Sequence, residues 1–136
     1  MKSIAVFIAF VALLTGLSGC VSTKSLSADV LKYTRWQLHT INGKPVQLPN
    51  PVSIRFIDAL QVNGFAGCNR FFGEGRVDNG KLLVANLGMT RKACSDSENR
   101  VEQQLLTLLR GGVSAELDKQ ILRLNAKQTF EFVRVQ

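Results

Sequence analysis

Asn63-Gly64-Phe65-Ala66-Gly67-Cys68-Asn69-Arg70-Phe71-Phe72-Gly73 is the stretch around which the rest of the sequence is organised. It holds three glycines, three phenylalanines and one cysteine in eleven positions. Glycine tolerates positive φ angles and lets backbones approach closely, and phenylalanines of this kind are usually buried. The stretch therefore predicts a strand that ends, turns sharply and starts again.

Alternating apolar and polar residues predict strands on both sides of this stretch. The turn signals Asn42-Gly43 and Asp78-Asn79-Gly80 separate strands that pair as hairpins. Pro45, Pro49 and Pro51 mark an irregular loop. The predicted strands cover residues 36–41, 52–56, 61–65, 72–77, 81–87, 113–117, 121–124 and 129–135.

Helical spacing occurs once, after Ser95. Ser95 and Glu98 fit a capping box, with the serine as N-cap and the glutamate at N3. An apolar stripe follows, and Gly111-Gly112 ends the helix. The stripe consists of Val101, Leu105, Leu108 and Leu109. The predicted fold class is α+β: a strongly curved antiparallel sheet, forming a partly open barrel of seven or eight strands, with one helix over its open side.

The first nineteen residues have the features of a signal peptide: Lys2, an apolar run over residues 4–14 and small residues before Cys20. Leu17-Ser18-Gly19-Cys20 resembles a bacterial lipobox, so Cys20 is the expected lipidation site; the alternative is a plain signal peptide. We expect a lipoprotein acylated with chains such as palmitate. Inner-membrane lipoproteins of enteric-type bacteria resemble one another in carrying aspartate directly after the lipidated cysteine. This sequence has Val21 there, which favours the outer membrane and a periplasmic orientation.

Three segments follow from this interpretation: a signal peptide (1–19), a lipidated flexible linker (20–30) and one domain (31–136). The formal net charge is +7, and the basic residues are scattered rather than clustered. A solvated surface explains this pattern, and attraction to anionic lipids or an acidic partner is the alternative. No nucleic-acid-binding motif is present, so nucleic acid is not an expected partner.

Cys68 and Cys94 are the cysteines of the predicted domain. In an oxidising periplasm two such cysteines usually form a disulfide bond. Reduced structural thiols, a catalytic cysteine with His39 and a zinc site remain alternatives. A zinc site needs about four ligands, and one histidine with two cysteines supplies too few. We therefore expect a disulfide and no metal or other cofactor.

Other polar residues have simpler interpretations than catalysis. His39 lies in the polar register of a strand, and Asn69 is expected to cap backbone groups in a turn. Arg70 is expected in a surface ion pair, with anion binding as the alternative. Glu98 and Glu102 lie one helical turn apart and could act as an acid–base pair. A capping residue and a solvated neighbour explain them more simply. The aromatic residues expected in the core are Trp36, Phe65, Phe71, Phe72, Phe130 and Phe132.

The sequence resembles the HslJ/META domain family over essentially the whole domain, from about Trp36 to the end. The central Gly-Cys-Asn-Arg element and the downstream Thr90-Arg91-x-Ala93-Cys94 carry the resemblance most specifically. Lys92 departs from the methionine that is frequent in the family. The remaining matches are Trp36-x-Leu38, Ile41-Asn42-Gly43, Glu98, Leu122-x-Leu124 and Phe130-x-Phe132.

The resemblance implies a bacterial envelope lipoprotein associated with heat shock and with tolerance of novobiocin. It implies a fold similar to that of secretion-system pilot lipoproteins and no enzymatic activity. We expect a module that binds a hydrophobic ligand or a segment of an envelope protein, in a groove near Trp36, Phe65 and Leu105. A filled core at these residues is the alternative outcome. The other functional candidates are a small periplasmic inhibitor of a wall-active enzyme and a cysteine or carboxylate hydrolase.

Overall fold

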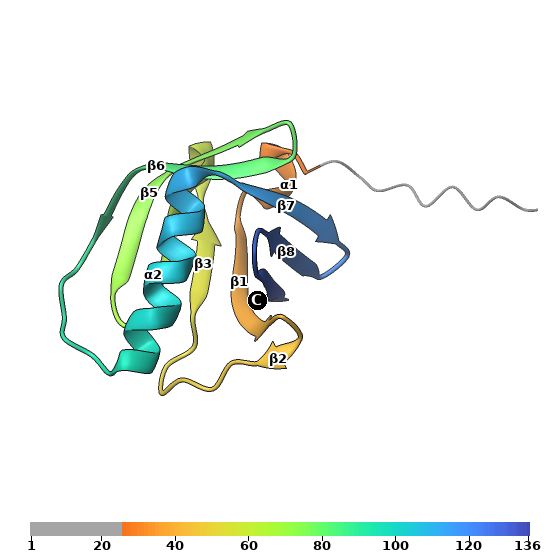
Figure 1. Ribbon diagram of the computed structural model, residues 1–136. Helices are drawn as coiled ribbons and strands as arrows, with labels where there is room; N and C mark the ends of the chain where they lie inside the picture. Colours follow the sequence, from red (N-terminus) through yellow and green to blue (C-terminus); the bar gives the residue numbers. More distant parts are fainter. Residues whose placement is uncertain (1–25) are drawn as a thin grey trace, which may run out of the picture.

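Nine antiparallel strands form a single sheet in the computed structural model, which describes residues 26–136 (Figure 1). The predictions for the signal peptide and for Cys20 lie outside the described residues. The strands are β1 (Thr34–Ile41), β2 (Lys44–Pro45), β3 (Ser53–Phe56), β4 (Gln61–Phe65), β5 (Arg70–Asp78), β6 (Lys81–Met89), β7 (Val113–Asp118), β8 (Ile121–Asn125) and β9 (Thr129–Val135). The helices are α1 (Ala28–Leu31), the short 3₁₀ helix η1 (Asp58–Leu60) and α2 (Asp96–Gly111).

The sheet closes into a ring because β1 pairs with both β3 and β9. The two-residue strand β2 pairs with the far end of β1. Within the ring, the shortest strand pairing joins β6 to β7. Only Lys81↔Ser114 and Leu82↔Val113 are paired there. Helix α2 packs against β6 beside this junction (Figure 1). The prediction of a curved antiparallel sheet with one main helix is confirmed, and β2 accounts for the additional strand.

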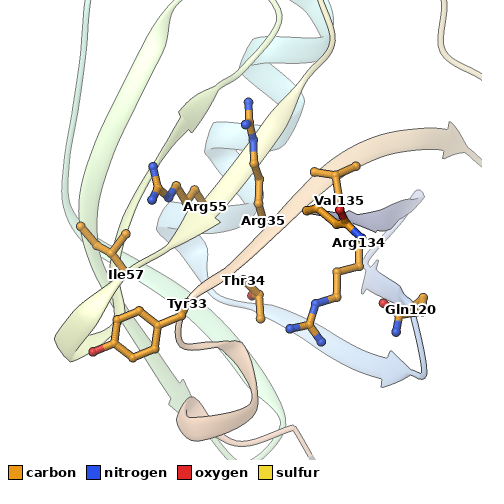
Figure 2. Close-up of a pocket in the computed structure, with 9 residues that line it drawn as sticks. Tyr33, Thr34, Arg35, Arg55, Ile57, Gln120, Arg134 and Val135 are labelled. Atoms are coloured by element: carbon orange, nitrogen blue, oxygen red, sulfur yellow. The ribbon is translucent and has the colours of Figure 1, made fainter.

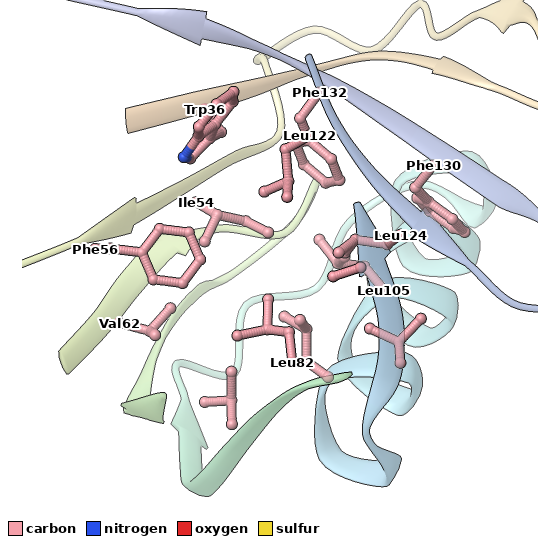
Figure 3. Packing of buried hydrophobic residues seen from close by; sticks show 14 of the residues in the cluster. Trp36, Ile54, Phe56, Val62, Leu82, Leu105, Leu122, Leu124, Phe130 and Phe132 are labelled. Carbon is pink, nitrogen blue, oxygen red and sulfur yellow. The ribbon is translucent and has the colours of Figure 1, made fainter. Parts of the chain in front are cut away.

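Alternation along the strands places one apolar face inside the ring. In β1, Thr34, Trp36 and Leu38 are buried, whereas the residues between them are exposed. Figure 3 shows the resulting cluster, in which side chains from opposite sides of the ring and from α2 meet. The largest fully buried side chains are Trp36, Phe56, Phe71, Phe130, Phe132, Leu31, Ile54, Leu82, Leu105, Leu106, Leu109 and Leu122. Their burial supplies the main driving force for folding.

The central glycine-rich stretch forms a tight connection between β4 and β5, as predicted. Gly64 lies so close to the neighbouring strand that a Cβ atom there would be 2.1 Å from the Ser53 carbonyl oxygen and 2.7 Å from the Phe71 ring. Gly67 has φ +118°, a conformation that favours glycine. These two positions require glycine for different reasons, close approach and backbone conformation.

Helix α2 begins where the capping box predicted. The Ser95 hydroxyl accepts a hydrogen bond from the Glu98 N–H, and Glu98 Oε2 accepts one from the Ser95 N–H. Hydrogen bonds from the Ser95 hydroxyl and N–H hold the pKa of Glu98 below its usual range. The buried face differs from the predicted stripe, because Val101 and Leu108 are only half-buried. Its buried residues are Glu102, Leu105, Leu106 and Leu109.

Two sequence-based expectations need correction. Phe72 was expected in the core, but it lies on the outer face with 58% of its surface exposed. Its ring covers Gly88 of β6, where a Cβ atom would be 2.7 Å from the ring. Phe65 is only half-buried. On the N-terminal side of β1, Leu26 is buried and the short helix α1 packs on the domain.

Candidate functional site

The structure joins Cys68 and Cys94 in a disulfide bond with an S–S distance of 2.02 Å. The bond links the β4–β5 connection to the segment just before α2. It leaves neither sulfur as a free thiol, so neither cysteine is a nucleophile in this state. His39 is on the exposed face of β1. Among residues 26–136, no group of three or more histidine, cysteine or acidic side chains is arranged to hold a metal ion.

Asn69 is the centre of a buried hydrogen-bond network beside the disulfide. Its side-chain NH₂ donates to Glu102 Oε1 (3.1 Å) and to the Lys92 carbonyl (3.3 Å). Its Oδ1 accepts from the Lys92 N–H (2.6 Å) and the Thr90 hydroxyl (2.9 Å). The side chain thus satisfies backbone groups of the segment before α2, whereas the sequence predicted that it would cap backbone groups within its own turn.

The structure corrects the predicted environment of Glu102. The sequence suggested a solvated neighbour of Glu98, but Glu102 is only 5% exposed. Its carboxylate accepts hydrogen bonds from the Asn69 backbone N–H and side-chain NH₂. Glu98 is engaged in the helix cap instead. The two carboxylates therefore hold different structural elements and do not form an acid–base pair.

The predicted ligand groove around Trp36, Phe65 and Leu105 is filled by the core. Trp36 and Leu105 have no exposed surface, and both pack within the central cluster (Figure 3). Phe65 is half-buried. The core is therefore filled at Trp36 and Leu105, which was the alternative to a ligand groove.

An apolar groove lies elsewhere, between α2 and the turn that joins β8 to β9. Its volume is about 660 Å³. The half-buried Leu108 provides apolar surface, Phe130 lies beneath the groove without exposed surface, and Lys127 is the one charged residue of the lining. Uncharged polar side chains complete the lining: Gln103, Gln104, Thr107 and Gln128, together with Ala126. The sequence indicated one part of this groove in advance, because Leu108 belongs to the predicted apolar stripe of the helix.

A second, polar pocket of about 740 Å³ lies at the end of the ring where α1 leads into β1. Figure 2 shows Arg35 and Arg55 side by side on neighbouring strands, with Arg134 on β9 nearby. The remaining lining residues include Tyr33, Thr34, Ile57, Gln120, Val135 and Gln136. In the sequence these arginines are scattered and were expected on a solvated surface. The ring brings them together from three strands.

Residues 29–136 match the sequence pattern of the META domain. The chain belongs to the META domain family. This META protein is 36% identical over 137 residues to Heat shock protein HslJ of Escherichia coli (strain K12), a match that covers 97% of this chain and 95% of the relative. No helix of residues 26–136 is long and apolar enough to cross a membrane.

Two solved structures share the fold of this META protein. One NMR structure, of a protein 34% identical to it, superposes with a TM-score of 0.71 and covers 79% of this chain and 94% of the other. A second NMR structure, of a protein from Burkholderia xenovorans, is 25% identical with a TM-score of 0.65 and covers 80% of this chain and 86% of the other. The ring with its helix is therefore similar to the folds of both proteins.

Proposed function

We propose that this META protein is a non-enzymatic binding protein of the bacterial envelope, anchored by lipid at Cys20 in the outer membrane and facing the periplasm. Its role is in heat-shock and envelope-stress tolerance, including tolerance of novobiocin. It acts by binding an apolar segment of another envelope protein. The observation that carries the binding proposal is the apolar groove between α2 and the β8–β9 turn.

The size and lining of the groove support a ligand of this kind. Ligand pockets usually have volumes of about 300–1,000 Å³ and combine an apolar floor with a few polar groups. The apolar floor here includes the half-buried Leu108 and rests on Phe130, which is fully buried in the core. Because that floor is part of the folded core, the groove is formed before any ligand arrives.

The groove suits an apolar segment of a peptide. Gln103, Gln104 and Gln128 belong to the lining, although most of the surface that faces the groove is apolar. Each amide carries donors and acceptors that match the N–H and C=O groups of a peptide backbone.

Filling the groove should abolish binding without unfolding the protein. Thr107 is exposed, so Thr107→Trp adds a large side chain to the rim and leaves the core intact. We expect a synthetic peptide with leucine at alternating positions to shift the NMR signals of the Gln103 and Gln128 amides saturably. In the variant these shifts should disappear, and growth with novobiocin should fall to that of a deletion strain.

Glu116→Trp is the matched control, because Glu116 is exposed on β7 and does not line the groove. It should retain both peptide binding and growth. Binding of a fatty acid at the groove without binding of the peptide would replace the peptide proposal by a lipid one. Unchanged growth of the Thr107→Trp strain would refute the role of the groove in tolerance.

The lipid anchor is tested separately. Cys20→Ala removes the thiol that the lipobox pattern assigns to lipidation. We expect the variant to leave the outer-membrane fraction and to accumulate as soluble periplasmic protein or uncleaved precursor. Fractionation with the outer membrane at the wild-type level would rule out anchoring through Cys20.

A further inference from the structure

The arginine pocket at the α1 end of the ring has an unusual charge arrangement. Arg35 and Arg55 are directly opposite each other across the β1–β3 pair. Residues in such pairs have Cβ atoms about 4.5–5.5 Å apart, and like charges there are destabilising. Arg134 adds a third positive charge to the pocket lining. The fold therefore concentrates positive charge where sheet stability alone would disfavour it.

Within residues 26–136, no acidic side chain forms an ion pair with the three pocket arginines. The ion pairs that form in this part of the chain use Lys32 and Arg123 as their cations. Asp58 is the acidic residue beside the pocket. A hydrogen bond from the Tyr33 phenol to the Asp58 carboxylate, together with the negative charge of Asp58, raises the pKa of Tyr33. The arginines remain available to an external anion.

The position of the pocket indicates which anion it meets. Tyr33 lines the pocket and follows α1 closely, so the pocket lies where the N-terminal segment enters the domain (Figure 2). The chain between Cys20 and Leu26 spans at most about 20 Å when extended, at about 3.3–3.6 Å per residue. A lipid anchor at Cys20 would therefore hold this end of the domain against the membrane surface.

We propose that the arginine pocket docks the domain onto the membrane by binding the phosphates of anionic lipid head groups. The inference rests on the proposed lipid anchor, which supplies the proximity. Guanidinium groups form charge-assisted, often bidentate, hydrogen bonds with phosphate oxygens. Ile57 and Val135 add apolar surface beside the arginines. Docking fixes the orientation of the ring, and the groove between α2 and the β8–β9 turn then has a defined position relative to the membrane.

Vesicle binding tests the proposal with residues 20–136 carrying Cys20→Ala, so that neither acyl chains nor the predicted signal peptide contributes to binding. We expect binding to vesicles that mix phosphatidylglycerol with phosphatidylcholine, and little binding to phosphatidylcholine alone. Arg35→Gln, Arg55→Gln and Arg134→Gln should each weaken binding about fivefold, the effect typical of one basic residue near an anionic surface.

Arg91→Gln is the charge-matched control, because Arg91 is exposed in the segment before α2 and does not line the pocket. An equal loss of binding in this control would show a diffuse charge effect and overturn the pocket proposal. Urea unfolding should find Arg55→Gln at least as stable as the parent protein, since the change removes like-charge repulsion. Weaker vesicle binding in that variant would then not reflect unfolding.

A second experiment distinguishes binding of lipid phosphates from binding of a soluble anion. Inorganic phosphate is titrated while the NMR signals of the arginine Nε–H groups are followed. Saturable shifts with phosphate but no binding to anionic vesicles would assign the pocket to a soluble anion and overturn membrane docking. The anchor is judged independently by the fractionation of Cys20→Ala, so a failure of docking and a failure of anchoring give different results.

Discussion

Asn69→Ala is expected to lower the free energy of unfolding by about 3–4 kcal/mol. The substitution removes the amide that binds Glu102 Oε1, the Lys92 backbone and the Thr90 hydroxyl. Each buried polar group left without a partner costs about 1–3 kcal/mol, and more when it is charged. Glu102 would retain only the backbone N–H of residue 69. Equilibrium urea unfolding measures the change.

Asn63→Ala is a suitable control for this substitution. Asn63 belongs to the neighbouring strand β4 and is exposed, so its loss should change the unfolding free energy by less than about 0.5 kcal/mol. If the two variants were equally stable, the network around Asn69 would contribute nothing measurable. Its role in holding the segment before α2 would then have to be abandoned.

Cys68→Ser and Cys94→Ser should each cost about 2–5 kcal/mol, the usual effect of removing a disulfide from a small secreted domain. The bond spans a sequence separation of 26 residues. On the loop-entropy account, its loss enlarges the unfolded ensemble. Urea unfolding of the wild type with and without a thiol reductant should reproduce the same loss.

Coupling provides a second check on this region. The Asn69 amide lies 3.2 Å from the Cys68 sulfur and also binds the segment that carries Cys94. Residues that share a network are generally not additive. The double variant Cys68→Ser with Asn69→Ala should therefore lose less stability than the two single losses added together. In the experiment with the thiol reductant, a urea unfolding midpoint that is the same with and without reductant would contradict the role of the disulfide.

The sequence was sufficient to predict most elements because their signals are local. Alternation fixed the strands, and Ser95 with Glu98 fixed the start of α2. Phe72 was misplaced because both it and Phe71 are aromatic, and only the strand register decides which faces inward. Phe71 is buried, whereas Phe72 covers Gly88 on the outer face.

The burial of Glu102 had a signal that was overlooked. Glu102 precedes Leu105, Leu106 and Leu109 at helical spacing, so it belongs to the same face of α2. A carboxylate on an apolar face requires buried hydrogen-bond donors, and Asn69 supplies them. The gathering of Arg35, Arg55 and Arg134 had no comparable signal, because it depends on the pairing of β1 with β9. Pairing between distant segments leaves no periodic pattern in a sequence.

That same pairing determines when the protein can fold. Ribosomes deliver the chain from its N-terminus, so β1 is available long before its second partner, β9, at residues Thr129–Val135. Until β9 arrives, one edge of β1 lacks its partner and the Trp36 side of the core is incomplete. Contacts between segments this far apart slow folding. A chain delivered in this order cannot close its sheet until almost all of it has emerged, and the proposed export to the periplasm would benefit from that delay.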